Sequence, residues 1–223
     1  MMFRNRNEAA LLLAERLAPY RNKHPLVLAI PRGAVPMGRL IADALEGELD
    51  VVLVRKLGAP GNAEFAIGSV DEGGWAYVAE YAASTGADAA YIEAEKQAQL
   101  EVMRRRRAEY TPVRPPIDPA GRVVIVVDDG LATGATMISA LHALRSKSPA
   151  RLIVAVPVSP PDTLRKVQAL ADETVCLAAP AHFAAVGQFY QEFNQVSDAE
   201  VIAFVEKTPG AVAIRIWLTK DAK

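Results

Sequence analysis

VVIVVDDGLATGAT, residues 123–136, is the stretch of the sequence that indicates the fold. It begins with a run of β-branched apolar residues, which is typical of a strand buried on both faces of a parallel sheet. Two carboxylates, Asp128 and Asp129, follow the run directly, and a loop of small residues then leads into a helical pattern. Because open α/β sheets bind ligands at the carboxyl ends of their strands, the stretch predicts a strand, a binding loop and a helix.

The residues of this loop suit a phosphate group. Small side chains let backbone N–H groups approach the phosphate, hydroxyl groups add donors, and the N-terminus of the next helix favours negative charge. Carboxylates accept hydrogen bonds from a vicinal diol and tolerate a nearby cation. We therefore expect a site for a sugar 5′-phosphate, formed by Asp128, Asp129, Gly130, Ala132, Thr133, Gly134, Ala135 and Thr136. The alternative is that the two acids only cap a turn before the helix.

Apolar runs and helical patterns alternate along the rest of the chain, which predicts a parallel sheet covered by helices. The runs are Leu26–Ile30, Val51–Arg55, Val123–Val127, Leu152–Val156 and Thr174–Leu177. The helical stretches are Met37–Leu45, Thr136–Ser146 and Thr163–Ala171. We expect a single α/β domain over residues 1–223, with a five-stranded parallel sheet flanked by helices. All five strands are expected to be buried, and a small hood is expected from about 1–25 and 178–223.

Two segments depart from this alternation. Gly58–Gly74 is rich in glycine and acidic residues and predicts a loop that leads into a short hairpin, with Gly73-Gly74 at its turn. Asp88–Tyr110 predicts a long polar helix. Its basic run Arg104–Arg107 does not indicate a nucleic-acid site, because consecutive helical positions, about 100° apart, point almost all the way round a helix. We expect a solvated or interface helix instead.

The C-terminal part carries a helix signal. Ser197 and Glu200 fit a capping box, which would open a helix that runs through Val205. Thr208-Pro209-Gly210 would end this helix, and Ala211–Leu218 predicts a late strand or an extended tail.

Composition excludes several classes of protein. With 25 Lys and Arg against 26 Asp and Glu, the net charge of -1 indicates no general attraction to nucleic acid or to an anionic membrane. The longest apolar runs, such as Ala9–Ala14, are far shorter than the roughly 20 residues that span a bilayer. The single cysteine, Cys176, cannot close an intramolecular disulfide, so a cytoplasmic location is the simplest expectation.

The pattern of four apolar residues, two acids, two spacers and A-T-G-x-T resembles the signature of type I phosphoribosyltransferases. In that family the two acids contact the 2′ and 3′ hydroxyls of a ribose. The loop holds the 5′-phosphate of 5-phosphoribosyl-1-pyrophosphate (PRPP), which is bound with Mg²⁺. The resemblance implies these roles for Asp128, Asp129 and Ala132–Thr136, with Asp128 and Asp129 near the metal mostly through the ligand.

A second match follows the first predicted strand, where members of the family carry a short pyrophosphate-binding loop. Pro31-Arg32-Gly33-Ala34 lies between an apolar strand and a helix, which is the context that a backbone anion site needs. The resemblance implies that Pro31, Arg32 and Gly33 contact the pyrophosphate and that the Pro31–Arg32 peptide bond is cis. The alternative is a turn with an incidental arginine.

A third match is Arg55-Lys56-Leu-Gly, which is similar to the Arg-Lys-x-Gly of adenine-specific members. In the family, the loop after the second strand closes over the site. The resemblance implies that Lys56, and with less support Arg55, contacts the pyrophosphate and that Glu64 belongs to the same lid. The alternative is that both cations are surface charges at a strand end.

The sequence motif for the residues that would bind the acceptor is less specific than the three matches above. His182–Glu192 looks like the F-V-V-G-Y-x-x-D stretch of the 6-oxopurine enzymes, in which case Phe183 would stack on a base. Gln191 stands in the acidic position, however, and Ala132 replaces the loop Asp of those enzymes, which argues against hypoxanthine or guanine. The alternative for Phe183 and its aromatic neighbours is a packing cluster.

Together these matches imply a Mg²⁺-dependent enzyme that transfers ribose 5-phosphate from PRPP to a nitrogen acceptor of the nucleobase type and releases pyrophosphate. Asp128, Asp129, Arg32 and Lys56 would be its catalytic residues, nucleotide salvage its context, and a homodimer is possible in such a family. The whole chain is similar to bacterial predicted phosphoribosyltransferases of undefined acceptor that share R-K-L-G-A-P-G-N and V-G-x-x-Y-x-x-F. The alternative function is a non-catalytic sensor of PRPP or nucleotides with the same fold.

Overall fold

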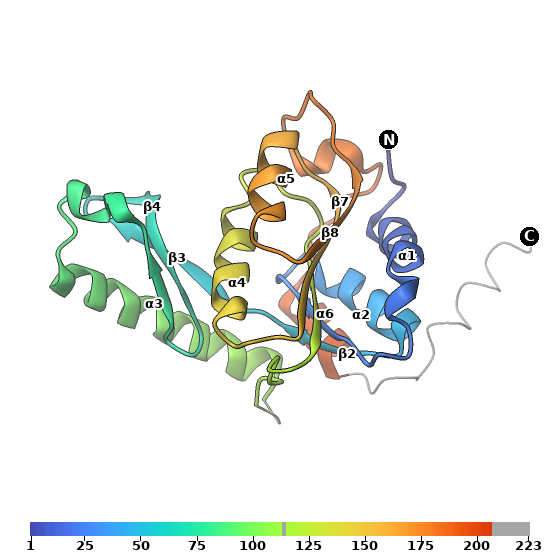
Figure 1. The fold of residues 1–223 in the computed structure, drawn as a ribbon, viewed down its shortest axis with the longest axis horizontal. Helices are drawn as coiled ribbons and strands as arrows, with labels where there is room; N and C mark the ends of the chain where they lie inside the picture. Colours follow the sequence, from blue (N-terminus) through green and yellow to red (C-terminus); the bar gives the residue numbers. More distant parts are fainter. Residues whose placement is uncertain (113–114, 207–223) are drawn as a thin grey trace, which may run out of the picture.

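A five-stranded parallel sheet forms the centre of the protein (Figure 1). The computed structural model of the chain describes residues 1–112 and 115–206. In spatial order the strands are β2 (Glu48–Val51), β1 (Leu26–Ala29), β6 (Val123–Val127), β7 (Arg151–Val158) and β8 (Glu173–Ala178). This sheet, flanked by helices, confirms the fold class predicted from the sequence.

Helices cover both faces of the sheet. α1 (Arg6–Arg16) and α2 (Val35–Leu45) lie on one face, and α4 (Ala135–Arg145) and α5 (Pro161–Gln168) lie on the other (Figure 1). The three helices expected after the first, third and fourth apolar runs are all present. α5 ends at Gln168 instead of Ala171, because the Leu170 N–H donates to Val167 O and tightens the last turn.

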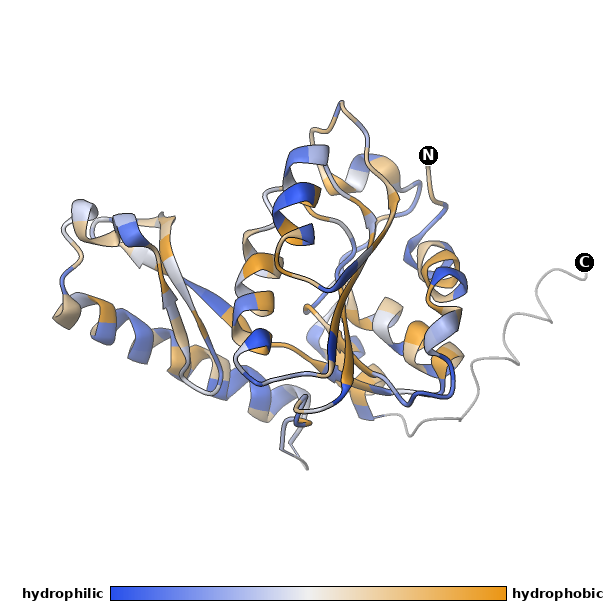
Figure 2. Ribbon diagram, viewed as in Figure 1, coloured by the Kyte–Doolittle hydropathy of each residue, from blue (hydrophilic) through white to orange (hydrophobic). Residues whose placement is uncertain are grey.

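The central strands are buried on both faces, as their sequence predicts. Ile125 packs in the apolar layer under α1 and α2, whereas Val124 and Val126 pack in the opposite layer with Met137 and Leu141 of α4. Successive side chains of a strand point to opposite faces, so one continuous apolar run supplies both layers. Figure 2 shows these strands as a hydrophobic centre between helices with polar outer surfaces.

The prediction that residues 174–177 form a buried central strand is wrong. β8 is an edge strand of the sheet, and each of its side chains is half-buried. Cys176 is among them: it packs against the apolar layer of α4, and its Sγ lies 3.2 Å from Ala178 O. The apolar sequence therefore predicted a strand correctly here, but it did not predict that the strand lies at the edge of the sheet.

The predicted strand Val51–Arg55 also differs from the structure. β2 begins earlier, at Glu48, and ends at Val51, while β3 (Val54–Ala59) leaves the parallel sheet altogether. The sequence pattern missed the start of β2 because Asp50 looks like a solvated residue. Its side chain is in fact buried and forms an ion pair with Arg107 at 2.8 Å.

A second, antiparallel sheet is separate from the parallel sheet and packs beside α4 (Figure 1). It contains β3, β4 (Asn62–Asp71) and β5 (Ala76–Val78) and is followed by the short helix η2 (Glu80–Thr85) and by α3 (Ala89–Tyr110). We call residues 54–110 the arm. The small hood was expected from other residues, about 1–25 and 178–223. The loop predicted over residues 58–74 is corrected to paired strands, because cross-strand pairing and contact with α3 override the low strand propensity of glycine and acids.

The expected features of the arm are partly present. The turn between β4 and β5 contains Gly73 and Gly74, as predicted, and α3 begins after Asp88, whose side chain accepts a hydrogen bond from Tyr91 N. The basic run of α3 does not form one face: Arg104 is largely exposed, whereas Arg107 is buried against the core. Among the described residues, no helix combines the length and apolarity that crossing a bilayer requires.

The two segments assigned to the hood from the sequence contact each other. Phe3 pairs with the segment after β8 through hydrogen bonds between its N–H and Phe189 O and between Gln191 N–H and Phe3 O. Further on, Ser197 and Glu200 form the predicted capping box of α6 (Asp198–Glu206). The assignment of these segments as a hood stays a prediction, and the predicted helix stop at 208–210 and strand at 211–218 lie outside the described residues.

Candidate functional site

The small-residue loop connects the carboxyl end of β6 to the N-terminus of α4, as the sequence predicts. Gly134 caps α4 with a φ of 74°, a backbone conformation that glycine adopts without strain. Asp128, Gly130 to Met137 and Val186 surround a cavity of about 190 Å³. Backbone N–H groups at the start of the helix therefore border an open space, which is the arrangement that binds phosphate groups.

A residue outside the predicted set supports this loop. Thr163, in the first turn of α5, is buried, and its hydroxyl donates a hydrogen bond of 2.8 Å to Ala132 O. Its methyl group also packs so closely that a Cβ on Gly134 would lie 2.6 Å from it. The loop is thus held from the neighbouring helix. The sequence carries no signal for this contact beyond the position of a threonine at a helix start.

Asp128 lines the same cavity, and Asp129 follows it directly in the chain. Asp128 Oδ1 accepts a hydrogen bond of 2.9 Å from Asp129 N. Loss of hydration raises the pKa of Asp128 well above its usual value, and the neighbouring charge of Asp129 adds to this effect. Loss of hydration also raises the pKa of Asp129, although Arg6 opposes it. Two acids are therefore held together in partly desolvated surroundings, where a bound cation or hydroxyl group is favoured.

Arg6, the first residue of α1, binds one of these carboxylates. Its Nε lies 2.9 Å and its Nη2 2.8 Å from Asp129 Oδ2. Its Nη1 donates to Asn194 O at 2.6 Å, and the guanidinium lies 3.9 Å from the centre of the Phe193 ring. The sequence analysis missed Arg6, because no local pattern relates residue 6 to residue 129.

The segment after β8 binds the backbone of the same residue, Asp129. The Tyr190 hydroxyl donates a hydrogen bond of 2.6 Å to Asp129 O, and burial raises the pKa of this phenol. The rings of Tyr190 and Phe193 stack with centroids 4.9 Å apart. The carboxyl end of β6 is thus linked directly to the C-terminal segment and to α1.

The predicted pyrophosphate loop lies beside Asp129. The Pro31–Arg32 peptide bond is cis, as the family resemblance implies, and the next helix, α2, begins at Val35. A Cβ on Gly33 would lie 2.1 Å from Asp129 Oδ2, so the loop backbone runs against the carboxylate. The sequence-predicted Gly33 and Asp129 are therefore brought together by β1 and β6, which are neighbours in the sheet.

The side chain of Arg32 points toward α6. Its Nη1 lies 3.4 Å from Asp198 Oδ2, and both side chains are well exposed. Tyr110 donates to the other oxygen of Asp198 at 2.7 Å, and burial together with this acid raises the pKa of Tyr110 to about 12. Arg32 is thus held by a solvent-exposed contact that a more highly charged ligand would outcompete.

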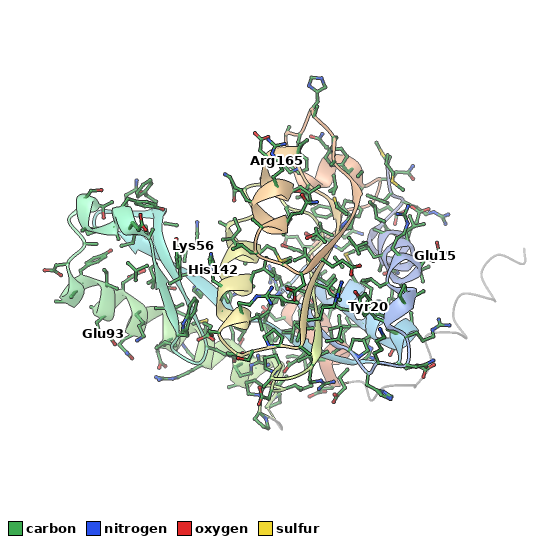
Figure 3. All side chains as sticks on the ribbon, in the orientation of Figure 1. Glu15, Tyr20, Lys56, Glu93, His142 and Arg165 are labelled. Atoms are coloured by element: carbon green, nitrogen blue, oxygen red, sulfur yellow. The ribbon has the colours of Figure 1, made fainter. Side chains whose placement is uncertain are left out.

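Arg55 and Lys56 lie on β3, on the part of the arm that faces the core. They line a second cavity, of about 290 Å³, whose other walls include Glu95, Gln99 and Thr136. Arg55 Nε donates to Gln99 Oε1 at 2.6 Å. Because Thr136 borders both cavities, the cavity lined by Arg55 and Lys56 adjoins the phosphate loop. Figure 3 shows Lys56 in the space between the arm and α4. The side chain of Glu64 lies outside the described part.

Phe183 is not at the wall of the phosphate-loop cavity, where Val186 lies instead. Its half-buried ring packs against Phe189, with centroids 5.2 Å apart, and against the core. This contact favours the packing alternative for Phe183. Its role in stacking on a base stays a prediction.

Asp128 and Asp129 fit a Mg²⁺ ion that arrives with a ligand. No described residues form a cluster of three or more His, Cys, Asp or Glu side chains that would hold a metal alone. Carboxylate oxygens are the ligands that Mg²⁺ prefers, and this ion is usually shared with substrate phosphates. Asp128 Oδ2 and Asp129 Oδ1 accept no hydrogen bond from any residue that the structure describes.

The fold and the site define an α/β domain with a small-residue loop and two carboxylates at the carboxyl ends of its parallel strands. Comparison with known proteins agrees. Residues 4–193 match the family described as "Phosphoribosyl transferase domain". The chain belongs to this family of phosphoribosyl transferase domains.

Individual relatives extend the comparison. The chain is 41% identical over 207 residues to the proteins named "Putative phosphoribosyl transferase MT0597" and "Putative phosphoribosyl transferase Rv0571c", from two strains of Mycobacterium tuberculosis. This alignment covers 92% of the chain but 47% of each relative, so the chain spans about half the length of the curated relatives it matches. It is also similar to the crystal structure of TT1426 from Thermus thermophilus, with a TM-score of 0.84, 48% identity and coverage of 92% of this chain and 98% of that chain.

Proposed function

We propose that the protein is a Mg²⁺-dependent phosphoribosyltransferase, which transfers ribose 5-phosphate from PRPP to a nitrogen acceptor of the nucleobase type and releases pyrophosphate. The observation that carries the proposal is the meeting of three elements at one edge of the sheet. The phosphate loop, the two carboxylates and the Gly33 loop converge there, with Gly33 in contact range of Asp129.

Each group of residues has a chemical role in this proposal. Asp128 and Asp129 accept hydrogen bonds from the ribose hydroxyls, and the loop Ala132–Thr136 binds the 5′-phosphate through its N–H and hydroxyl groups. The backbone of Gly33 and the side chains of Arg32 and Lys56 stabilise the charge that develops on the departing pyrophosphate. Catalysis then rests on positioning and charge stabilisation, without a covalent intermediate on the protein.

Mg²⁺ would be held near Asp128 and Asp129, mostly through the bound ligand, and would neutralise the pyrophosphate charge. The arm would supply the movable part of the site. Arg55 and Lys56 line a cavity next to Thr136, so a small movement of the arm toward α4 would bring both cations closer to a ligand on the phosphate loop. Closure of this kind excludes water from the cationic, oxocarbenium-like ribosyl centre, which water would otherwise hydrolyse.

The proposal is tested by the release of pyrophosphate from PRPP and Mg²⁺ in the presence of purine, pyrimidine and small amine acceptors. Thermal-shift measurements with PRPP and with inorganic phosphate accompany the assay. Release with one acceptor would support the transferase and identify the acceptor. Stabilisation by PRPP without turnover with any acceptor would favour a sensor of PRPP, and no response of either kind would overturn the proposal.

A variant with Asp128→Asn and Asp129→Asn provides the internal control. These substitutions keep the size of both side chains and remove their charge. PRPP should stabilise the variant much less than the wild-type protein, whereas inorganic phosphate, which binds the loop alone, should stabilise both to a similar extent.

A further inference from the structure

We infer that Arg6 is a positioning residue of the ribose site: it holds Asp129 so that one oxygen of each acid remains available for the ribose diol. This inference rests on the proposed function and extends it to a residue of α1 that lies far from the sequence motif of the site.

The hydrogen bonds of the two acids divide their oxygens into two sets. Asp128 Oδ1 accepts from Asp129 N, and Asp129 Oδ2 accepts from both Nε and Nη2 of Arg6. Within the described residues, Asp128 Oδ2 and Asp129 Oδ1 accept no hydrogen bond. One oxygen of each of two consecutive acids therefore remains as an acceptor, and a vicinal diol has two hydroxyl groups to donate.

The guanidinium of Arg6 is fixed by more than its ion pair. It is 12% exposed, donates to Asn194 O through Nη1 and lies over the ring of Phe193. A planar guanidinium with partners in three directions has little freedom to rotate, so it sets the orientation of the carboxylate that it binds. A lysine could supply the charge but not this fixed geometry.

Arg6 also lies next to the pyrophosphate loop. A Cβ on Gly33 would be 3.2 Å from Arg6 Nη2 and 2.1 Å from Asp129 Oδ2. The loop backbone therefore closes the side of Asp129 on which Arg6 binds. The backbone at Gly33 and the guanidinium of Arg6 therefore lie against the same oxygen of Asp129, Oδ2.

The charge balance supports the same assignment. Two adjacent carboxylates in partly desolvated surroundings repel each other, and a single fixed cation compensates one of them. Asp129, which is 16% exposed, is the acid that Arg6 contacts directly. With Arg6 included, the site has about the net charge of one carboxylate. This charge favours the binding of hydroxyl groups and of a cation that is shared with the ligand.

The test measures selectivity for the hydroxyl groups. Isothermal titration calorimetry on the full chain compares ribose 5-phosphate with 2-deoxyribose 5-phosphate and 3-deoxyribose 5-phosphate, and inorganic phosphate reports on the loop alone. The wild-type protein should prefer ribose 5-phosphate by about tenfold over each deoxy sugar, because each lacks one hydrogen bond to a charged acceptor. Arg6→Ala should lose the preference over at least one deoxy sugar and bind inorganic phosphate as the wild type does.

Two further variants separate positioning from general damage. Arg6→Lys retains the charge and should recover only part of the lost preference, since it lacks the planar fork. Arg16→Ala removes an exposed arginine from the end of the same helix and should keep the wild-type preference. Circular dichroism tests whether each variant is folded.

The outcomes are distinct. If the wild type showed no affinity for PRPP or ribose 5-phosphate, the proposed function would fall, and the inference about Arg6 with it. If the wild type preferred ribose 5-phosphate and Arg6→Ala kept both preferences, the inference about Arg6 alone would be overturned. A parallel loss of affinity for all four ligands would also overturn it, because it would show a structural role only.

Discussion

Gly33 and Asp129 lie so close that a Cβ atom on Gly33 would be 2.1 Å from Asp129 Oδ2. The two residues are far apart in the sequence and are joined by the pairing of β1 with β6. Non-bonded heavy atoms pack at about 3.5 Å, so any side chain at position 33 must move the carboxylate or the loop. The absence of a side chain at Gly33 is thus a requirement of the site.

We expect Gly33→Ala to weaken the binding of PRPP by about tenfold or more, because it displaces Asp129 and with it the diol contact. Isothermal titration calorimetry measures this loss. Gly73→Ala is the matched control: it lies in the turn after β4, where the nearest atom to a new Cβ is 3.3 Å away. Equal affinities for PRPP in the wild type and Gly33→Ala would contradict the role given to this contact.

A second prediction concerns Thr163, which supports the phosphate loop from α5 through its hydrogen bond to Ala132 O. Thr163→Val keeps the shape of the side chain and removes the hydroxyl. We expect a loss of about 1 kcal/mol of stability and a several-fold weaker affinity for inorganic phosphate, since the loop loses one anchor. Thr163→Ser keeps the hydroxyl and should retain more of the phosphate affinity than Thr163→Val. The opposite order would show that the methyl contact with Gly134, and not the hydrogen bond, holds the loop.

The sequence was sufficient to predict the elements whose signals are local. The apolar run before Asp128 predicted β6, the small-residue loop predicted the turn that lines the cavity before α4, and Ser197 with Glu200 predicted the start of α6. Each of these depends on residues within a few positions of one another. The central strands could be recognised for the same reason, because burial on both faces requires an unbroken apolar run.

The features that the sequence did not indicate depend on contacts between distant residues. Arg6 and Thr163 join the site only through the packing of α1 and α5, and neither has a distinctive neighbour in the sequence. The start of β2 was missed because the buried Asp50 has its partner, Arg107, in the distant helix α3. The hairpin turn at Gly73-Gly74 was predicted, but the paired strands before it were predicted as a loop, because they are stabilised by pairing and not by propensity.

The buried ion cluster of Arg107 leads to a third prediction. Arg107 binds Asp50 at 2.8 Å, Glu72 at 2.5 Å and Val51 O at 2.9 Å, and so joins α3 of the arm to β2 of the core. Arg107→Met would leave two acids without their cation in buried surroundings. We expect a loss of about 3–5 kcal/mol in the free energy of unfolding, which chemical denaturation measures.

Arg104→Met is the control for this prediction. Arg104 is largely exposed and lies 3.6 Å from Glu101 on the same helix, so its removal should change the stability by less than about 1 kcal/mol. If the two variants were equally stable, the cluster around Arg107 would not hold the arm to the core.

The last prediction concerns pH. Asp172 accepts two hydrogen bonds from Arg145, at 3.0 and 3.1 Å, and one from Leu152 N at 2.7 Å. The hydrogen bonds from Arg145 are the main cause that lowers the pKa of Asp172 below its usual value of 3.8, and the hydrogen bond from Leu152 N is the second. A carboxylate with a lowered pKa stabilises the folded state above the pKa of the unfolded chain, and this stabilisation is lost as the pH falls through the lowered value. The ionised side chain of Asp172 therefore stabilises the fold at neutral pH but not in strong acid.

We expect the wild type to melt at a higher temperature than Asp172→Asn at neutral pH, with a difference that is constant above about pH 5 and narrows as the pH falls below about 4. Differential scanning fluorimetry between about pH 3 and pH 7 measures both proteins. With Arg145→Met as the background, the narrowing should be smaller, because the main cause of the lowered pKa is removed. A difference in melting temperature that stayed the same over the whole range would show that Asp172 stabilises the end of α4 through its shape and not through its charge.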